Sequence, residues 1–457
     1  MSFKLKCMTS LAAIAVLAGN AGAETLEQAI SAALATNPQL ESQRTLSDLA
    51  REDLNQARAL GRPTLNLSGS AGYEYTDSDS PLSFNLGDRP IASAQLQAIQ
   101  PLYTGGRISS SIRQAKAGIA ASDQQLEAAR QDLILDVVTA YVDVRAARDT
   151  VAIRENNVVV TSEQVRAAND RFDVGVVTRT DVSLAQARLE GATAALAGAE
   201  AAQVANEANY QFLTGLNPEA LAAPPPLPPL PASIEIATQL ALDVSPDLSA
   251  ARHQERAAGE AIKVARSQSK PQINLVAGAG VQQTFGDAER RDSNMSAVAQ
   301  GRIPLMSGGL IRSQVRSAKL QRSQAKLQIA SIERQLRAQV AQAWYGYEAE
   351  QRAIDASARQ VEAAQIAYDG AKEELAVGVR TTLDVLDQEQ QLFEARLSLV
   401  QAERDAYVAA HRLLRATGGL KPDVLGASMG ETESITRTAL ELDEEFVAPE
   451  VDLIEGE

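Results

Sequence analysis

The feature that most constrains this chain is a series of apolar residues spaced by seven, which occurs twice. The first series is Val137, Val144, Val151, Val158, Val165 and Phe172, and the second is Val340, Tyr347, Ile354, Val361, Tyr368 and Leu375. A strict period of seven keeps one seam of a helix against a partner, so it predicts a left-handed coiled coil rather than a helix on a globular core. We therefore expect two very long helices, each roughly 100 Å in length.

Each predicted long helix is followed by the same short motif, so each is expected to end in a hairpin tip. The first copy spans residues 172–182 and the second spans residues 375–385, which is 203 residues later. A glycine suited to the left-handed conformation closes the first helix, and a threonine followed three residues later by an aspartate forms the capping-box pattern that begins the next. These residues are Gly175, Thr178 and Asp181 in the first copy and Gly378, Thr381 and Asp384 in the second.

Two other stretches change the apolar period from seven to two. Residues 64–103 and 272–306 are predicted strand hairpins with one apolar and one polar face. Four strands cannot close a barrel, and open strand edges are not tolerated in a bilayer. We therefore expect the chain to oligomerise with lipid against the apolar face, rather than to form a small water-soluble sheet. The residues expected to face lipid are Leu65, Leu67, Tyr73, Tyr75, Leu275, Val281 and Leu305.

The whole plan is present twice, which indicates an internal duplication. We expect a signal peptide over residues 1–23, a first structural repeat over 24–221, a proline-rich linker over 222–231, a second repeat over 232–418 and an acidic, disordered tail over 419–457. The first repeat is expected to begin with a single helix from residue 26 to about residue 60. The long helices are expected over 107–174 and 310–377, and the returning helices over 181–214 and 384–417.

Composition and cysteine usage exclude several classes of function. The net charge of −15 disfavours a nucleic-acid surface. Cys7, the only cysteine, precedes the apolar part of the signal peptide and would be removed with it, so the mature chain is expected to have no disulfide and no lipid anchor. No segment after residue 23 has the ~20 apolar residues of a membrane helix. His253 and His411 lie on helical stretches away from any acid–base constellation, so we expect no enzyme, cofactor or metal site.

Three features together resemble the TolC family of outer-membrane channel proteins. They are the two tips, the turns at 101–106 and 304–309, and the duplication. The resemblance covers essentially the whole mature chain, and the second tip is more similar to the TolC branch than to the lipidated OprM branch. It implies a homotrimer in which a twelve-stranded transmembrane β-barrel is continued by a periplasmic α-helical barrel of antiparallel coiled coils. It also implies an exit duct in the outer membrane of a Gram-negative bacterium. The partners implied are a periplasmic adaptor and an inner-membrane ABC or proton-driven transporter, for type I protein secretion or multidrug efflux.

The resemblance also implies a gate at the periplasmic tips. The residues that match are Arg380, Thr180 and Asp181 for a latch between neighbouring chains, Asp384 and Asp387 for two acidic rings at the entrance, and Gly175, Thr178, Gly378 and Thr381 for the tip turns and adaptor docking. Leu375 stands where the family has a tyrosine, so part of the family latch is missing. The residues by themselves leave open that the aspartates only begin helices or lie on a solvated helix face.

Two other functions compete with a channel. A periplasmic adaptor also has an exported N-terminus and a coiled-coil hairpin, but adaptors have one hairpin between β-rich halves, whereas this chain has two hairpins and a duplication. A structural coiled-coil protein of the envelope would not need amphipathic strand hairpins. The sequence does not select between secreted proteins and small drugs as the substrate.

Overall fold

The computed structural model describes residues 23–76, 87–285 and 290–426. The expected signal peptide, except for Ala23, and most of the expected acidic tail lie outside these residues. The chain divides into two compact units. Among the described residues, unit 1 comprises residues 23–37, Gln131–Ile234 and residues 341–426, and unit 2 comprises Pro38–Arg130 and Glu235–Val340. Helices α3 (Arg107–Asp173) and α7 (Leu310–Ala376) contribute to both units.

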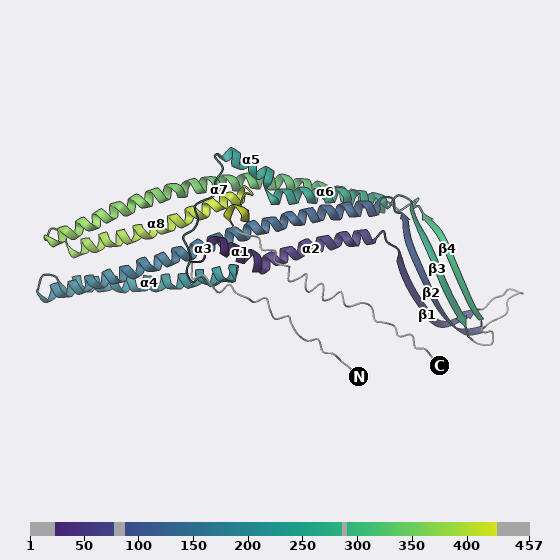
Figure 1. Ribbon diagram of the computed structural model, residues 1–457, viewed down its shortest axis with the longest axis horizontal. Helices are drawn as coiled ribbons and strands as arrows, with labels where there is room; N and C mark the ends of the chain where they lie inside the picture. Colours follow the sequence, from purple (N-terminus) through teal and green to yellow (C-terminus); the bar gives the residue numbers. More distant parts are fainter. Residues whose placement is uncertain (1–22, 77–86, 286–289, 427–457) are drawn as a thin grey trace, which may run out of the picture. The chain divides into compact units, whose positions relative to one another are not determined.

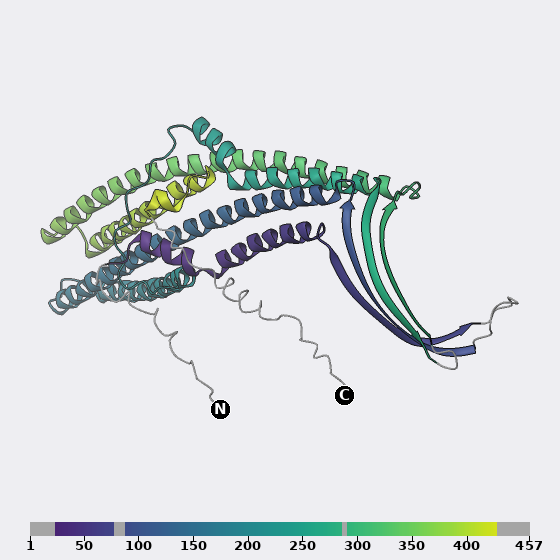
Figure 2. The same cartoon turned by 45° about the vertical axis from the view of Figure 1, so that its right-hand side comes forward.

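Unit 1 contains two antiparallel helical hairpins. Helix α4 (Arg179–Thr214) lies along α3, and α8 (Thr382–Ala416) lies along α7 (Figures 1 and 2). The seam predicted from the heptads is fully buried at Val137 and Val144, but Phe172 at the tip is 42% exposed. The largest fully buried side chains of the unit include Tyr141 and Tyr210. The unit also contains α1 (Leu26–Thr36) and the 3-10 helix η1 (Pro422–Leu425).

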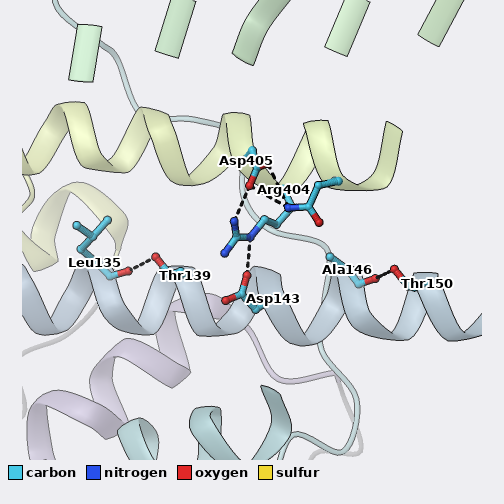
Figure 3. A network of polar contacts seen from close by, with 8 residues as sticks. Leu135, Thr139, Asp143, Ala146, Thr150, Arg404 and Asp405 are labelled. Atoms are coloured by element: carbon cyan, nitrogen blue, oxygen red, sulfur yellow. Dashed lines mark hydrogen bonds and ion pairs between the residues drawn. The ribbon is translucent and has the colours of Figure 1, made fainter. Parts of the chain in front are cut away.

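Arg404 joins α8 to α3. Its Nε donates to the carboxylate of Asp143 in α3, while Nη1 donates to neighbouring Asp405 (Figure 3). Thr139 and Thr150, on the same stretch of α3, instead donate within the helix to carbonyl oxygens four residues earlier, at 2.8 and 2.7 Å. The Arg404–Asp143 pair therefore links the two hairpins by charge, whereas the neighbouring hydroxyls form hydrogen bonds only within α3.

Unit 2 contains a four-stranded antiparallel sheet and the helices that lead into it. The strands are β1 (Thr64–Thr76), β2 (Gly87–Tyr103), β3 (Gln272–Thr284) and β4 (Arg290–Arg302), in the order β1-β2-β3-β4. The helices are α2 (Pro38–Ala59), α5 (Ile234–Val244) and α6 (Pro246–Ser267), with the first parts of α3 and α7. Among the described residues, no helix combines the length and apolar composition of a membrane span.

The strand register gathers most of the apolar residues of the sheet on one face. Leu67 is opposite Leu96, Leu96 is opposite Ala279, and Ala279 is opposite Met295. Because successive side chains of a strand alternate between faces, every second residue on either side of these four shares their face. The other face presents Asn66, Ser68, Gln95 and Gln97 and is mainly polar, with one apolar row at Ile99, Val276 and Val298.

The single helix expected from residue 26 to about 60 is wrong: the structure has two helices, α1 and α2, separated at Asn37. Proline has no backbone N–H and disfavours a helical conformation in the preceding residue. Asn37 before Pro38 is accordingly extended, with φ −70° and ψ 121°, and its side-chain amide donates to the Leu213 carbonyl at 3.2 Å. The second repeat has the same interruption, where Ser245 caps α6 just before Pro246.

The linker and the start of the tail are held by the helices. Tyr141 donates its hydroxyl to the carbonyls of Glu24 at 2.8 Å and Ala222 at 2.9 Å, and the Tyr407 hydroxyl donates to Pro225 at 3.2 Å. Leu420 is fully buried and residues 422–425 form η1, so the expectation of disorder from residue 419 onward is wrong for residues 419–426. The reason is apolar burial, because this segment begins with leucine and proline before its acidic residues.

Candidate functional site: the tips of the helical hairpins

Each hairpin ends in a turn that requires glycine. Gly175 and Gly378 both have φ of 77°, and the amides of Val176 and Val379 donate to Arg171 and Glu374 at 2.9 Å. A Cβ at either glycine would meet nothing within 4 Å, so crowding does not select glycine there. Glycine is instead favoured by the left-handed backbone conformation, because an L side chain is strained in that conformation.

The helix that follows each tip begins with a capping box, as the repeated motif predicts. Asp181 accepts hydrogen bonds from the backbone and hydroxyl of Thr178, both at 2.8 Å, and its own amide donates to the Thr178 hydroxyl at 3.4 Å. Asp384 and Thr381 repeat the arrangement, with distances of 2.9, 2.7 and 3.3 Å. These hydrogen bonds lower the pKa of both carboxyls. Both tips therefore carry an ionised carboxylate at neutral pH.

The proposed latch residues do not contact each other within one chain. Arg380 Nε donates to the carboxylate of Glu374 in its own hairpin, while Thr180 is exposed in the first turn of α4. A different contact joins the tips of the two hairpins: Arg171 Nη1 donates to the Thr382 hydroxyl at 3.2 Å. The sequence does not predict this contact, because nothing in the heptad pattern pairs residues 211 positions apart.

Asp387, expected in an acidic ring, forms an ion pair with Arg188 of α4 in the same chain. Arg188 also donates to the carbonyl of Leu386 at 3.3 Å. The side chains of Arg188 and Asp387 are 29% and 50% exposed, so water reaches the pair. The negative charge of Asp387 is therefore partly balanced within one chain, which the motif alone does not reveal.

Glu389, one half-turn further along α8, is the most unusual acid of the region. It is 4% exposed, and its Oε1 has no hydrogen-bond partner in the described part of the chain. Burial raises the pKa of Glu389 to about 7, although the charges of Arg188 and Lys372 oppose the shift. A polar cavity of 290 Å³ adjoins it, lined also by Arg154, Asn157 and Thr161.

The residues expected to face lipid lie on the apolar face of the sheet, with one exception. Leu65, Leu67, Tyr73 and Tyr75 of β1 are 66–83% exposed, and Leu275 and Val281 share their face through the register. Leu305 is 94% exposed but lies beyond the end of β4, so its placement in a strand is wrong. β4 ends at Arg302, and Pro304, which has no N–H to donate to a ladder, follows two residues later.

The two histidines lie on α6 and α8, one in each unit. His411 is fully buried, with Nδ1 2.8 Å from the Tyr407 carbonyl oxygen and its ring 4.6 Å from the Tyr407 ring. Burial lowers the pKa of His411, and burial together with the charge of Arg256 lowers that of His253. Within the described residues, no group of three or more His, Cys, Asp or Glu side chains could hold a metal ion.

The comparison with known proteins covers both repeats. The family model described as "Outer membrane efflux protein" matches residues 29–216 and 237–419. The outer membrane efflux protein BepC of Brucella suis is 34% identical over 418 residues, covering 91% of this chain and 90% of that protein. The outer membrane protein TolC of Escherichia coli is 28% identical, covering 87% of this chain and 83% of TolC.

Two further proteins are similar to this chain over most of its length. The alkaline protease secretion protein AprF of Pseudomonas aeruginosa is 28% identical over 80% of this chain and 79% of AprF. The structure of the open state of the MtrE outer membrane channel of Neisseria gonorrhoeae superposes with a TM-score of 0.74 at 25% identity, covering 87% of this chain and 90% of MtrE.

Proposed function

Because the chain belongs to the outer membrane efflux protein family, we propose that it is the outer-membrane channel of a tripartite export machine. The matches confirm the resemblance to the TolC family and the duplicated fold of long helices and strands. They also confirm the outer-membrane location and give no support to a periplasmic adaptor. The family consists of channels, and we infer that this chain likewise catalyses no reaction.

The observation that supports the proposal most directly is the two-faced sheet. Strands β1 and β4 are the outer strands of the sheet, and each has a ladder partner on one side only. Unpaired strand edges are unstable in lipid, so closure requires strands from other chains. Three copies form a barrel of twelve strands, with the Leu67 face toward lipid and the Ser68 face toward the lumen.

The helical hairpins form the periplasmic tunnel, and their tips form its gate. In the closed trimer, Arg380 of one chain binds Thr180 and Asp181 of its neighbour, while Asp384 and Asp387 give the entrance a negative charge. The tip turns at Gly175 and Gly378 are where the adaptor docks. An inner-membrane transporter supplies the energy, because the channel itself contributes only a wall and a gate.

The names of the relatives point to two kinds of cargo. BepC is named for efflux and AprF for the secretion of alkaline protease. Both kinds of cargo fit a channel with an exchangeable inner-membrane transporter, so we propose that the transporter, rather than this chain, selects the substrate.

Single-channel conductance in a planar bilayer tests the channel and the latch together. We expect small, cation-selective openings from the unmodified chain and much larger ones from Arg380→Ser. Each exposed latch contact contributes about 0.5 to 1 kcal/mol. Its loss in three chains changes the open-to-closed ratio by roughly ten- to a hundredfold.

Glu374→Gln is the matched control, because it frees Arg380 from its partner within the chain. If Arg380 latches neighbouring chains, this variant opens no more readily than the unmodified protein. If Glu374→Gln opens as much as Arg380→Ser, Arg380 merely stabilises its own turn. An unmodified chain that does not conduct contradicts the channel itself.

A further inference from the structure

We propose that Arg188 is a positioning residue of the gate, which holds α4 against the beginning of α8 in the same chain, and that buried Glu389 makes this contact sensitive to pH. The proposal rests on the channel function proposed above. It differs from the latch at Arg380 because both partners belong to one chain. The contact therefore controls the separation of the two hairpins of each subunit.

The geometry at Arg188 is that of a fork across two helices. Nη2 donates to the Asp387 carboxylate and Nη1 donates to the Leu386 carbonyl at 3.3 Å. Two acceptors on successive residues fix the orientation of the guanidinium as well as its position. Arg188 belongs to the first hairpin and Asp387 to the second. Any motion that separates α4 from α8 here must break both hydrogen bonds.

Glu389 is a buried carboxylate beside this contact. The residue is 4% exposed and its Oε1 lacks a partner among the described residues, which is costly for a carboxylate. The cavity of 290 Å³ beside it is lined by both Arg188 and Glu389, so the two side chains face the same space. Arg188 thus offsets the negative charge of Glu389 while it binds Asp387.

The charged and titratable groups around Glu389 come from four helices. They are Arg154 from α3, Arg188 from α4, Tyr368 and Lys372 from α7, and Asp387 from α8. Burial outweighs the charges of Arg188 and Lys372, so the pKa of Glu389 is raised to about 7. Asp387, the other acid of this group, is paired with Arg188.

The sign of the pH dependence follows from this shift. When the hairpins separate, Glu389 enters water and its pKa falls toward the ordinary value of about 4.3. The closed form therefore binds the proton more tightly than the open form. Acidification through pH 7 stabilises the closed form, and this stabilisation is lost as the pH rises above 7. The channel is expected to open more readily at pH 8 than at pH 6.

The test is single-channel recording of the full chain at pH 6 and pH 8. Arg188→Ala should raise the open-to-closed ratio about three- to tenfold at pH 8, with a smaller rise at pH 6, where Glu389 is protonated and needs no cation. Arg188→Lys, which keeps a cation beside Glu389 and Asp387 but loses the planar fork of the guanidinium, should give a ratio between those of Arg188→Ala and the unmodified chain. Glu389→Gln, which mimics the protonated acid, should abolish the difference between the two pH values.

The matched control is Arg352→Ala, which removes an exposed ion pair with Glu348 within one helix and should change nothing. The proposal is overturned if Arg188→Ala behaves like the unmodified channel, if Arg188→Lys opens as readily as Arg188→Ala, or if Glu389→Gln keeps the pH dependence. In each case the unmodified channel still conducts, so the proposed function stands.

A second measurement does not depend on conduction. The mature chain is expected to lack cysteine, so spin labels at Gln186→Cys and Gln391→Cys report the distance between α4 and α8 in the purified protein. Arg188→Ala should broaden that distance distribution at pH 8. An unchanged distribution contradicts the proposal even if the protein forms no channel.

Discussion

Gly175 and Gly378 show how a single residue can set the end of a hairpin. Both have φ of 77° and open space where a Cβ would stand. The backbone conformation therefore requires glycine at both positions, independently of what packs around the tip. The neighbouring aspartates act locally as well, since their carboxylates complete the capping boxes. A gate role for Asp181 or Asp384 has to be compatible with that local role.

Gly378→Ala should destabilise the tip by about 1 to 2 kcal/mol, because alanine is strained in the left-handed region. Gly370→Ala, eight residues earlier in α7, should instead stabilise the protein by about 0.5 to 1 kcal/mol, since helical glycine is unfavourable. Denaturant midpoints of the two variants should therefore move in opposite directions. Equal shifts would show that the tip turn tolerates a side chain.

Among the elements, the helices bury their apolar residues within the chain, whereas the sheet does not. The helices bury a seam against one another, and charged pairs such as Arg404–Asp143 join one hairpin to the other (Figure 3). The sheet instead leaves an entire apolar face exposed within one chain, with Tyr73 83% and Met295 88% exposed. Such a face is stable only when lipid covers it, so the sheet depends on its surroundings more than the helices do.

Leu67→Arg places a charge on the lipid face of β1 and should cost up to about 2 to 4 kcal/mol per chain near the bilayer centre. The neighbouring Ser68→Arg places the same charge on the opposite face, where the lumen is aqueous, and should have little effect. Outer-membrane fractionation distinguishes them, because only Leu67→Arg should reduce the inserted fraction. Equal insertion of both variants would contradict the assignment of the faces.

At the scale of the whole molecule, the end of the described chain belongs to unit 1. Leu420 is fully buried and Leu425 is 7% exposed, although the acidic composition beyond residue 419 predicted disorder. Burial of two leucines provides about 3 to 6 kcal/mol, which matters for a fold of marginal net stability. The functional boundary of the tail is therefore expected after Gly426.

Removing residues 427–457 should leave trimer assembly and export intact, because the buried segment remains. Removing residues 419–457 deletes both leucines and should lower the thermal midpoint and the yield of trimer. Native gel electrophoresis of the two truncated chains measures the difference. Loss of the trimer in the shorter deletion would show that the acidic residues are structural.

Local sequence patterns account for the kinds of element and for their repetition. A period of seven, a period of two and the repeated glycine–threonine–aspartate tip are local patterns, and each depends on the geometry of one backbone segment. The same patterns were sufficient to identify the family and the capping boxes at Thr178 and Thr381. They missed the break at Asn37 because the leucines of α1 and α2 continue across Pro38 without a visible change in composition.

The packing of the helices determines which side chains meet across them. The Arg188–Asp387 and Arg171–Thr382 contacts join residues about two hundred positions apart, and the burial of Glu389 depends on three helices around it. No local pattern marks these residues, because a glutamate on a helix looks solvated until its neighbours are known. Charge and burial at a site are properties of the assembled helices, whereas helix ends and strand faces are properties of the chain.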